Sequence, residues 1–319
     1  FGTIAFGDAS AAESVLIMPR VVIGRRDDRF WITTVDDAKL PAATVWAKNN
    51  TVSMTPGALG RDAFSTLVDR AVALIRNGDL EKVVLARDLQ GTVPSDFDLR
   101  PVLGKLAARY PSCWVYSVDG MFGASPELLV RVSHQQVSAR VLAGTAARGT
   151  DPGVDQAISK ALTSSHKNVA EHEFAVRSLV NALEPFCDHV DADTEPFSLA
   201  LPNLWHLASD VHGVLKDSAS VLDLAAALHP TAAVAGTPRS KAQELIGELE
   251  PFDRGRYAGP VGWIGADGDG EWVIALRGAQ LEGDSIRAFA GCGIVAESEG
   301  ESELAETDLK FQPILGALA

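Results

Sequence analysis

The sequence predicts an α+β fold in which antiparallel sheets are covered by outer helices. Candidate strands come in runs and candidate helices come in runs, without the strict alternation of βαβ units. Hydrophobic residues make up 46% of the 319 residues, which is enough for a sizeable buried core. No low-complexity linker or short repeat interrupts the chain. We therefore expect one domain over residues 1–319.

The first half of the chain predicts strands before and after two helices. The runs VLIMPRVVIG and RFWITTVDD are apolar or alternating, which is typical of short strands. Apolar residues recur on one face from Asp62 to Arg76 and again from Phe97 to Arg109, so both segments predict helices. Between them, EKVVLARDL over residues 81–89 predicts a strand. After the second helix, CWVYSVDG, GMFGAS, ELLVRVS and QVSARVLAG follow with short turns, which predicts an antiparallel meander.

The second half repeats these patterns. One long helix is predicted from about Asp155 to Leu183. Further helices are predicted over residues 219–228, 239–250 and about 300–314, and strands over 257–264, 271–280 and 284–290.

Composition excludes several classes of function. The formal net charge is −14, and binding to nucleic acid needs a basic surface instead. A small anionic substrate is not excluded, because salt screens the distant charge. The sequence has no apolar run of 18 residues, so we expect no membrane span. Three widely spaced cysteines suit a reducing compartment, hence the cytoplasm. The chain begins with Phe1, so we expect its natural N-terminus to be truncated.

Two groups of carboxylates are candidate metal ligands. Glu171 lies in the helical segment SHKNVAEHEF, and such a segment taken alone is most often a solvated helix face. The segment AESEGESELAETDLK is a stronger indication of a metal site, because Glu303 and Glu306 share one helical face and repel each other. A bound Mg²⁺ would offset that repulsion, since Mg²⁺ prefers oxygen ligands and takes one or two carboxylates. An ordinary acidic surface segment is the alternative.

Glycines and basic residues nearby are candidate anion contacts. Gly291 and Gly293 flank Cys292 in FAGCGIV, where backbone N–H groups can approach a ligand, although a tight turn also explains them. Arg277 ends the strand WVIALR and can bind a carboxylate through two hydrogen bonds, although an exposed charge at a strand end also explains it. Lys310 lies one turn after Glu306, where an intrahelical ion pair is the alternative.

Lys82 and Glu127 are candidates for proton transfer. Lys82 opens a strand whose face-mates are apolar, and burial would lower the pKa of its amine and make it a base. Glu127 follows a proline in FGASPELLVRV, and burial there would raise its pKa and make it an acid. A lysine at the end of a strand is usually just exposed, and on spacing alone a surface strand residue explains Glu127 equally well.

The order of these segments resembles the chorismate-utilising enzyme family. The resemblance rests on EKVVLAR, FGASPELLVRV, LAGTAARG, HKNVAEH, LHPTAAVAGTP, YAGPVGW, EWVIALR, AGCGIV and ELAETDLK, which follow one another over residues of about 60–319. The family includes isochorismate, salicylate, anthranilate and aminodeoxychorismate synthases. It implies one domain of two antiparallel sheets packed face to face, the substrate chorismate, and a monomer.

The resemblance also implies roles for particular residues. Glu171 and Glu306 correspond to Mg²⁺ ligands, with Glu303 in support. The remaining correspondences are substrate contacts at Gly144, Thr145, His206, Ala233, Tyr257, Arg277, Gly291, Cys292, Gly293 and Lys310. Two positions depart from the family pattern: Asn168 replaces an acidic residue near the metal, and Cys292 replaces the usual alanine.

Lys82 indicates which reaction is catalysed. The resemblance implies that family members that add ammonia lack this lysine, whereas members that add water have it. Glu127 corresponds to the acid that protonates the departing C4 hydroxyl as water attacks C2. Ala233 resembles isochorismate synthases, while members that also eliminate pyruvate tend to have threonine there. We therefore expect isochorismate synthase activity. Salicylate synthase, the synthase component of an ammonia-adding complex, and a non-catalytic cation-binding protein are the alternatives.

Overall fold

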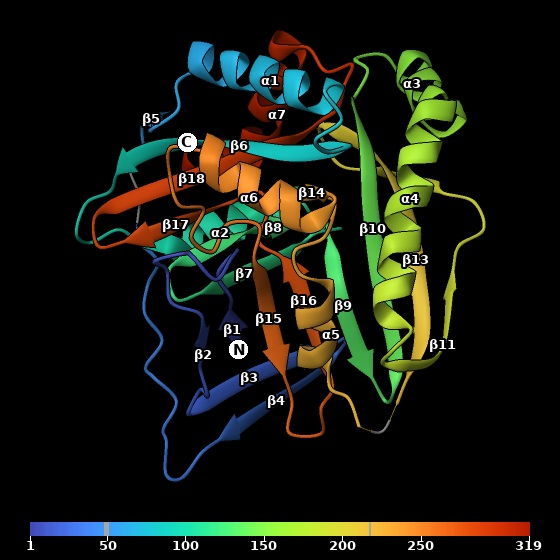
Figure 1. Cartoon of the computed structure of the whole chain (residues 1–319). Helices are drawn as coiled ribbons and strands as arrows, with labels where there is room; N and C mark the ends of the chain where they lie inside the picture. The colour runs from blue at the N-terminus through green and yellow to red at the C-terminus, as the bar shows by residue number, and fades with distance from the viewer. Residues whose placement is uncertain (48–50, 217) are drawn as a thin grey trace.

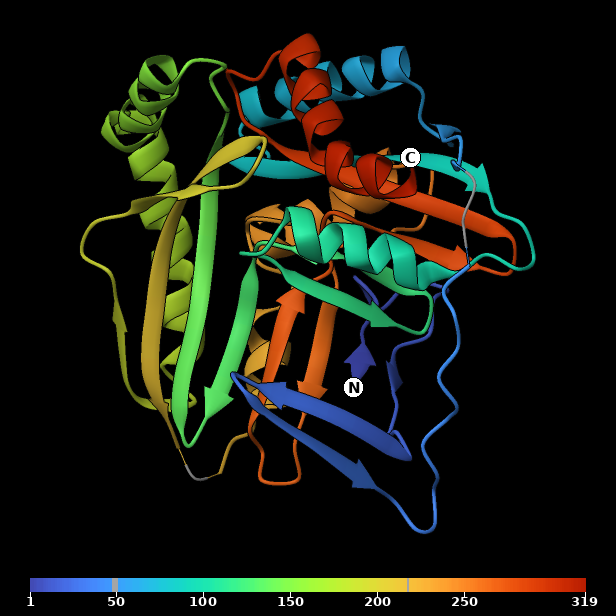
Figure 2. The ribbon, with the colours of Figure 1, turned by 180° about the vertical axis from the view of Figure 1, so that it is seen from behind.

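Two large antiparallel sheets and a separate hairpin contain the strands of the residues that the structure describes (Figure 1). The computed structural model describes residues 1–47, 51–216 and 218–319, apart from the side chains of residues 166–168, 170 and 171. Helices lie on the outside of the sheets, as Figure 2 shows from behind. The predicted α+β class is confirmed. Within the described residues, no helix is long and apolar enough to cross a membrane.

The first sheet has nine strands. In spatial order they are β11 (Cys187–Ala192), β13 (Leu204–Leu215), β10 (Gln136–Ala147), β9 (Leu128–Ser133), β16 (Gly270–Ile274), β15 (Pro260–Ile264), β1 (Gly2–Thr3) and β2 (Val15–Leu16), with β12 (Phe197–Ala200) also beside β13.

The second sheet has seven strands, and the hairpin is separate from both sheets. In spatial order the seven are β14 (Gly236–Thr237), β6 (Lys82–Thr92), β18 (Ser285–Ile294), β17 (Gly278–Glu282), β8 (Met121–Ser125) and β7 (Trp114–Val118), with β5 (Thr55–Pro56) also beside β6. The hairpin consists of β3 (Val21–Arg26) and β4 (Arg29–Thr34).

Helices cover the two sheets. They are α1 (Arg61–Arg76), α2 (Leu99–Arg109), α3 (Pro152–Ser164), α4 (His166–Leu183), α5 (Val221–Leu228), α6 (Arg239–Leu249) and α7 (Gly300–Leu318). In Figure 1, α4 runs along β10, and α1 and α7 lie together above β6. The sheets share a hydrophobic core in which Leu85 of β6 and Ile294 of β18 belong to the same cluster as Leu129 of β9 and Ile274 of β16.

Helix α7 is fastened to the seven-stranded sheet by a buried arginine. Arg87 of β6 is 2% exposed, donates a hydrogen bond of 2.7 Å to Thr307 Oγ1 and pairs with Asp308. Its guanidinium also lies 4.9 Å from the centre of the Phe311 ring. Because a buried charge is tolerated only when it is paired, these contacts fix where α7 lies on β6.

The prediction that residues 113–144 form one antiparallel meander is wrong. Strands β7 and β8 pair in the seven-stranded sheet, whereas β9 and β10 pair in the nine-stranded sheet. The chain changes sheets at Pro126 and Glu127, between β8 and β9. Proline has no N–H to continue a ladder of hydrogen bonds, which favours a break there.

The predicted strand over residues 271–280 is also two strands in different sheets. Strand β16 ends at Ile274 in the nine-stranded sheet, and β17 begins at Gly278 in the seven-stranded sheet. Arg277 lies in this crossing with φ of 53°, a left-handed conformation that is costly for a residue other than glycine.

The predicted long helix over residues 155–183 is interrupted. Helix α3 ends at Ser164, and Ser165 is extended, with φ of −72° and ψ of 111°. The hydroxyls of Thr163 and Ser164 donate to the carbonyl of Lys160 at 3.1 and 2.8 Å. Such side chains compete with the backbone for helical hydrogen bonds, which explains why the pattern overestimated the helix length.

Candidate active site

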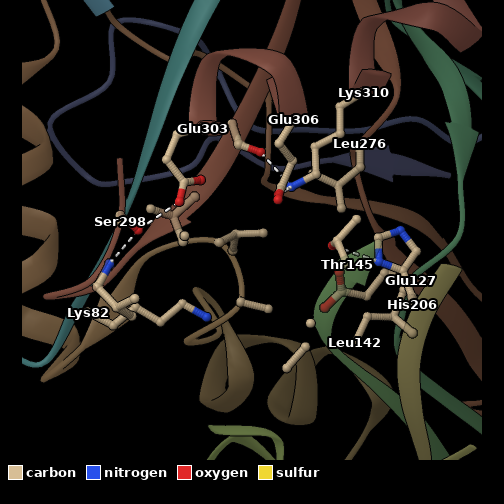
Figure 3. A pocket seen from close by; sticks show the side chains of 18 of the residues that line it. Lys82, Glu127, Leu142, Thr145, His206, Leu276, Ser298, Glu303, Glu306 and Lys310 are labelled. Carbon is tan, nitrogen blue, oxygen red and sulfur yellow. Dashed lines mark hydrogen bonds and ion pairs between the residues drawn. The ribbon is translucent and has the colours of Figure 1, made fainter. Parts of the chain in front are cut away.

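A pocket of about 370 Å³ lies where α7 meets both sheets. That volume suits a small metabolite. Figure 3 shows Lys82 of β6, Thr145 of β10, His206 of β13 and Glu306 of α7 around it. Almost all predicted site residues with described side chains line the pocket: Lys82, Glu127, Gly144, Thr145, His206, Ala233, Tyr257, Arg277, Gly291, Gly293, Glu303, Glu306 and Lys310.

Of the other two predicted residues, the structure describes the side chain of Cys292 but not that of Glu171. Cys292 is 1% exposed and belongs to the hydrophobic core, because alternate residues of β18 face opposite sides and only Gly291 and Gly293 face the pocket. Cys292 therefore does not line the pocket, and a contact between Cys292 and the substrate stays a prediction. The side chain of Glu171 lies outside the described residues, as do those of Lys167 and Asn168.

Glu127 is held at the first crossing between the sheets. Its backbone N–H donates to Ser125 Oγ at 3.2 Å, and that hydroxyl donates to the carbonyl of Ile274 at 2.6 Å. The side chain is 5% exposed. Burial raises the pKa of the Glu127 carboxyl to about 7, although Arg277, Lys310 and Lys82 each act to lower it. A large fraction of Glu127 is therefore protonated near neutral pH and can donate a proton.

Lys82 enters the pocket from the side opposite Glu127, as Figure 3 shows. It begins β6, where it pairs with Thr237 of β14. A side chain at Gly293 would collide with it, because a Cβ atom there would lie 2.6 Å from Lys82 Cε. Glycine at this position of β18 therefore leaves room for the amine of Lys82 to reach the pocket.

A chain of hydrogen bonds connects Arg277, His206 and Thr145. Arg277 Nη2 lies 3.2 Å from His206 Nε2, and His206 Nδ1 lies 3.1 Å from Thr145 Oγ1. A guanidinium can only donate, so Nε2 accepts and Nδ1 carries the proton that is donated to Thr145. Burial, followed by Arg277 and Lys310, lowers the pKa of His206 well below its usual value. The imidazole is therefore neutral, in one tautomer, and orients the guanidinium of Arg277.

A bulge in β10 turns Gly144 and Thr145 toward the pocket. The pairing of β10 with β13 shifts register between Leu142 and Thr145. Gly144 has φ of 85°, which glycine adopts without strain. Bulges of this kind re-aim side chains at functional sites.

Helix α7 contributes carboxylates and a lysine to the wall of the pocket. Lys310 Nζ donates to Glu306 Oε1 at 2.5 Å and to the carbonyl of Gly291 at 2.8 Å, which leaves one N–H of the ammonium for a ligand. Glu303 Oε1 accepts a hydrogen bond of 2.7 Å from Ser298. Burial raises the pKa of Glu303, and the neighbouring charge of Glu306 raises it further.

These carboxylates fit a divalent cation by their chemistry. Within the described part of the chain, no three His, Cys, Asp or Glu side chains converge into a complete metal site. However, Glu303 and Glu306 are half-buried carboxylates that repel each other, and Glu297 and Glu299 line the same pocket. An all-oxygen set of this kind suits Mg²⁺, which completes its shell with water and substrate.

Several lining residues were not predicted. The polar ones are Glu297, Ser298, Glu299 and Ser302, and the others include Val84, Pro126, Leu142, Leu276 and Val295. Both additional glutamates belong to the acidic segment that the sequence analysis identified, so their charge was a usable signal. The apolar residues gave no such signal, because they look the same as core residues until the fold is known.

Comparisons with known proteins agree on one family. The family described as chorismate binding enzyme matches residues 13–319. A Mycobacterium tuberculosis protein that carries the provisional name isochorismate synthase MenF is 44% identical over 271 residues, which are 80% of this chain and 73% of that protein. Isochorismate synthase DhbC of Bacillus subtilis is 40% identical over 79% of this chain and 66% of its own length. The solved structure of MenF, the menaquinone-specific isochorismate synthase of Escherichia coli, superposes with a TM-score of 0.85 at 27% identity, over all of this chain and 78% of that one.

Proposed function

Because this chain belongs to the chorismate-binding enzyme family, we propose that it is an isochorismate synthase. The reaction adds water at C2 of chorismate and releases the C4 hydroxyl as water. The observation that carries the proposal is the placement of Lys82 and Glu127 on opposite sides of one pocket (Figure 3). A base and an acid are needed at the two ends of the reacting π-system, and these two residues supply them.

One proton is transferred at C2 and one at C4 of chorismate, so the protons of the reaction balance. Lys82, as the neutral amine, accepts a proton from the attacking water, which raises its nucleophilicity. Glu127, as the protonated acid, donates to the leaving C4 hydroxyl, which departs as water. The raised pKa of Glu127 supports this role, because an ordinary glutamate would be ionised at neutral pH.

The cationic groups of the pocket bind the substrate. Arg277 can bind a carboxylate through two hydrogen bonds, and His206 holds the guanidinium in orientation. Lys310 has a remaining N–H for a second contact. Thr145 and the backbone at Gly144, Gly291 and Gly293 complete the polar lining.

The same proposal includes Mg²⁺ as cofactor. Glu306 and Glu303 would hold it, together with Glu171, whose side chain is not described. When bound, the ion supplies positive charge that binds the ring carboxylate of chorismate and neutralises the acidic wall.

Incubation of the purified protein with chorismate and MgCl₂, with products separated by chromatography, tests this function. We expect isochorismate to form, and we expect the Lys82→Ala protein to form none above background. Salicylate with pyruvate would instead indicate further elimination, and anthranilate in the presence of ammonium salts would indicate an ammonia-adding enzyme. Unchanged chorismate under all these conditions would overturn the proposal.

A further inference from the structure

Three residues form a row across the seven-stranded sheet, next to the second crossing between the sheets at residues 275–277. Tyr116 of β7 pairs with Gly123 of β8, and Gly123 pairs with Gly278 of β17. Residues that pair in this way lie on the same face of a sheet. A Cβ atom at Gly123 would lie 2.6 Å from the Tyr116 hydroxyl, and one at Gly278 would lie 2.5 Å from it. The two glycines therefore leave the space in which the ring of Tyr116 lies across both strands.

The hydroxyl of Tyr116 reaches the backbone of this crossing. It donates a hydrogen bond of 3.0 Å to the carbonyl of Leu276, the residue before Arg277. Tyr116 is 8% exposed, and burial raises the pKa of its hydroxyl, so the phenol keeps the proton that it donates. The carbonyl of Leu276 and the N–H of Arg277 belong to one planar peptide group. A hydrogen bond that holds this carbonyl therefore also restricts φ of Arg277.

The backbone of Arg277 depends on such a restriction. Its φ of 53° lies in the left-handed region, which is unfavourable for a residue with a side chain and persists only where surrounding contacts fix it. The carbonyl of Arg277 accepts a hydrogen bond of 3.3 Å from the N–H of Ala124. That bond holds the peptide group after Arg277, and Tyr116 holds the peptide group before it. With the backbone fixed on both sides, Arg277 Nη2 lies 3.2 Å from His206 Nε2.

We propose that Tyr116 is a positioning residue for substrate binding, which acts through the Leu276 carbonyl to orient the guanidinium of Arg277 toward a carboxylate of the substrate. The inference rests on the proposed function, in which Arg277 binds chorismate. Within the part of the chain that the structure describes, Leu276 and Arg277 line the pocket and Tyr116 does not. Without the hydroxyl, the peptide group before Arg277 can rotate. The guanidinium then leaves the orientation that two parallel hydrogen bonds to a carboxylate require.

Steady-state kinetics of Tyr116→Phe, which removes only the hydroxyl, tests this role. KM for chorismate should rise at least about threefold, and kcat should fall by a smaller factor than KM rises. The reason is that a carboxylate contact present both before and during the reaction contributes to KM and leaves kcat unchanged. A smaller rise in KM, or a loss that lies mainly in kcat, would refute the role of Tyr116 in substrate binding.

Tyr110→Phe is the matched control, because it removes the hydroxyl of a second buried tyrosine. Tyr110 follows α2, is 5% exposed and belongs to the hydrophobic cluster beneath that helix. Among the described residues, the hydroxyl that donates to the Leu276 carbonyl is that of Tyr116 and not that of Tyr110. KM of Tyr110→Phe should therefore stay within about twofold of wild type. An equal rise in KM in both variants would show that the loss of any buried hydroxyl weakens binding, and would refute the specific role of Tyr116.

A double-mutant cycle with Arg277→Gln tests whether Tyr116 acts through Arg277. Glutamine carries no positive charge and lacks the planar set of donors that binds a carboxylate through two hydrogen bonds. Tyr116→Phe should lower kcat/KM at least about threefold in the wild-type protein and by a clearly smaller factor in the Arg277→Gln protein, because the two residues act as one unit. A loss of the same size in both proteins would show that Tyr116 acts independently of Arg277 and would refute the inference.

Crystal structures of wild type and Tyr116→Phe test the orientation of Arg277 without reference to activity. The hydrogen bond between Arg277 Nη2 and His206 Nε2 should be present in wild type and should be lost in Tyr116→Phe, where the two atoms should lie more than about 3.5 Å apart. An Arg277 side chain in the same position in both crystals would refute the inference. A wild-type protein that leaves chorismate unchanged would refute the proposed function instead, and the crystal structures alone would then decide whether Tyr116 orients Arg277.

Discussion

Replacing Glu127 by glutamine should make the protein more stable and inactive at the same time. The pKa of Glu127 is raised from its ordinary 4.5 to about 7 by burial. The folded protein therefore binds this proton more tightly than the unfolded chain, so stability is lost as pH rises from 4.5 through 7. The full cost of ionising Glu127 in the folded protein is about 3 kcal/mol, at 1.36 kcal/mol per pKa unit.

The dependence on pH isolates this effect. Linkage gives a penalty of about 2 kcal/mol at pH 6 and about 3 kcal/mol at pH 8.5, and glutamine carries none of it. The difference in unfolding free energy between Glu127→Gln and wild type should therefore widen by about 1 kcal/mol between these pH values. Any change in hydrogen bonding that glutamine introduces is the same at both pH values and cancels.

Urea denaturation followed by circular dichroism measures this difference. Glu195→Gln, in the exposed turn between β11 and β12, serves as the control and should show no widening. A gap between Glu127→Gln and wild type that is equal at pH 6 and pH 8.5 would refute the argument that Glu127 is a buried acid with a raised pKa. The role of Glu127 as proton donor would then lose its electrostatic basis.

Four further outcomes follow from the site. Lys82→Ala should lower turnover by about 10²–10⁴-fold with little change in chorismate binding measured by calorimetry. Lys82→Arg should lose turnover to the same extent, because a guanidinium stays protonated and cannot act as a base. A rate above about a tenth of wild type in the Lys82→Ala protein would exclude Lys82 as the base. In pH profiles, kcat/KM should fall as pH rises above about 7, because Glu127 loses its proton there. Glu306→Gln should raise the Mg²⁺ concentration needed for half-maximal activity by at least about tenfold, and an unchanged metal titration would exclude Glu306 as a ligand. Gly293→Ala should lower kcat at least about tenfold while the melting temperature changes little, because the Cβ of the alanine would displace Lys82. An unchanged kcat would show that Lys82 adopts another position without loss of function.

Much of the fold could be predicted from local patterns. The helix ends at Arg76, Arg109 and Leu228 and the long strand β6 were predicted closely, because their apolar residues repeat with the period of the element they form. The strands β11, β12 and β13 were not predicted, although β13 is a central neighbour of β10. Their sequences mix charged and apolar residues without clear alternation, and long-range pairing stabilises them.

The two sheet crossings could not be predicted from pattern. Apolar residues continue through Ile274 and Leu276, so periodicity gives no sign that the chain leaves one sheet and enters the other. The residues of the candidate site were found despite this error, because their identities and order resemble a known family.

The two crossings have a consequence for recombination between related genes. Each sheet is assembled from stretches that are far apart along the chain, so exchanging one continuous fragment with a homologue replaces strands in both sheets at once. A junction at residues 125–128 or 275–277 would join segments from two different parent proteins within the crossings themselves. These are the positions whose backbone orients Glu127 and Arg277. Junctions in the exposed turn at residues 193–196 leave both crossings within intact parental fragments. Chimaeras joined there should retain activity more often than chimaeras joined at either crossing.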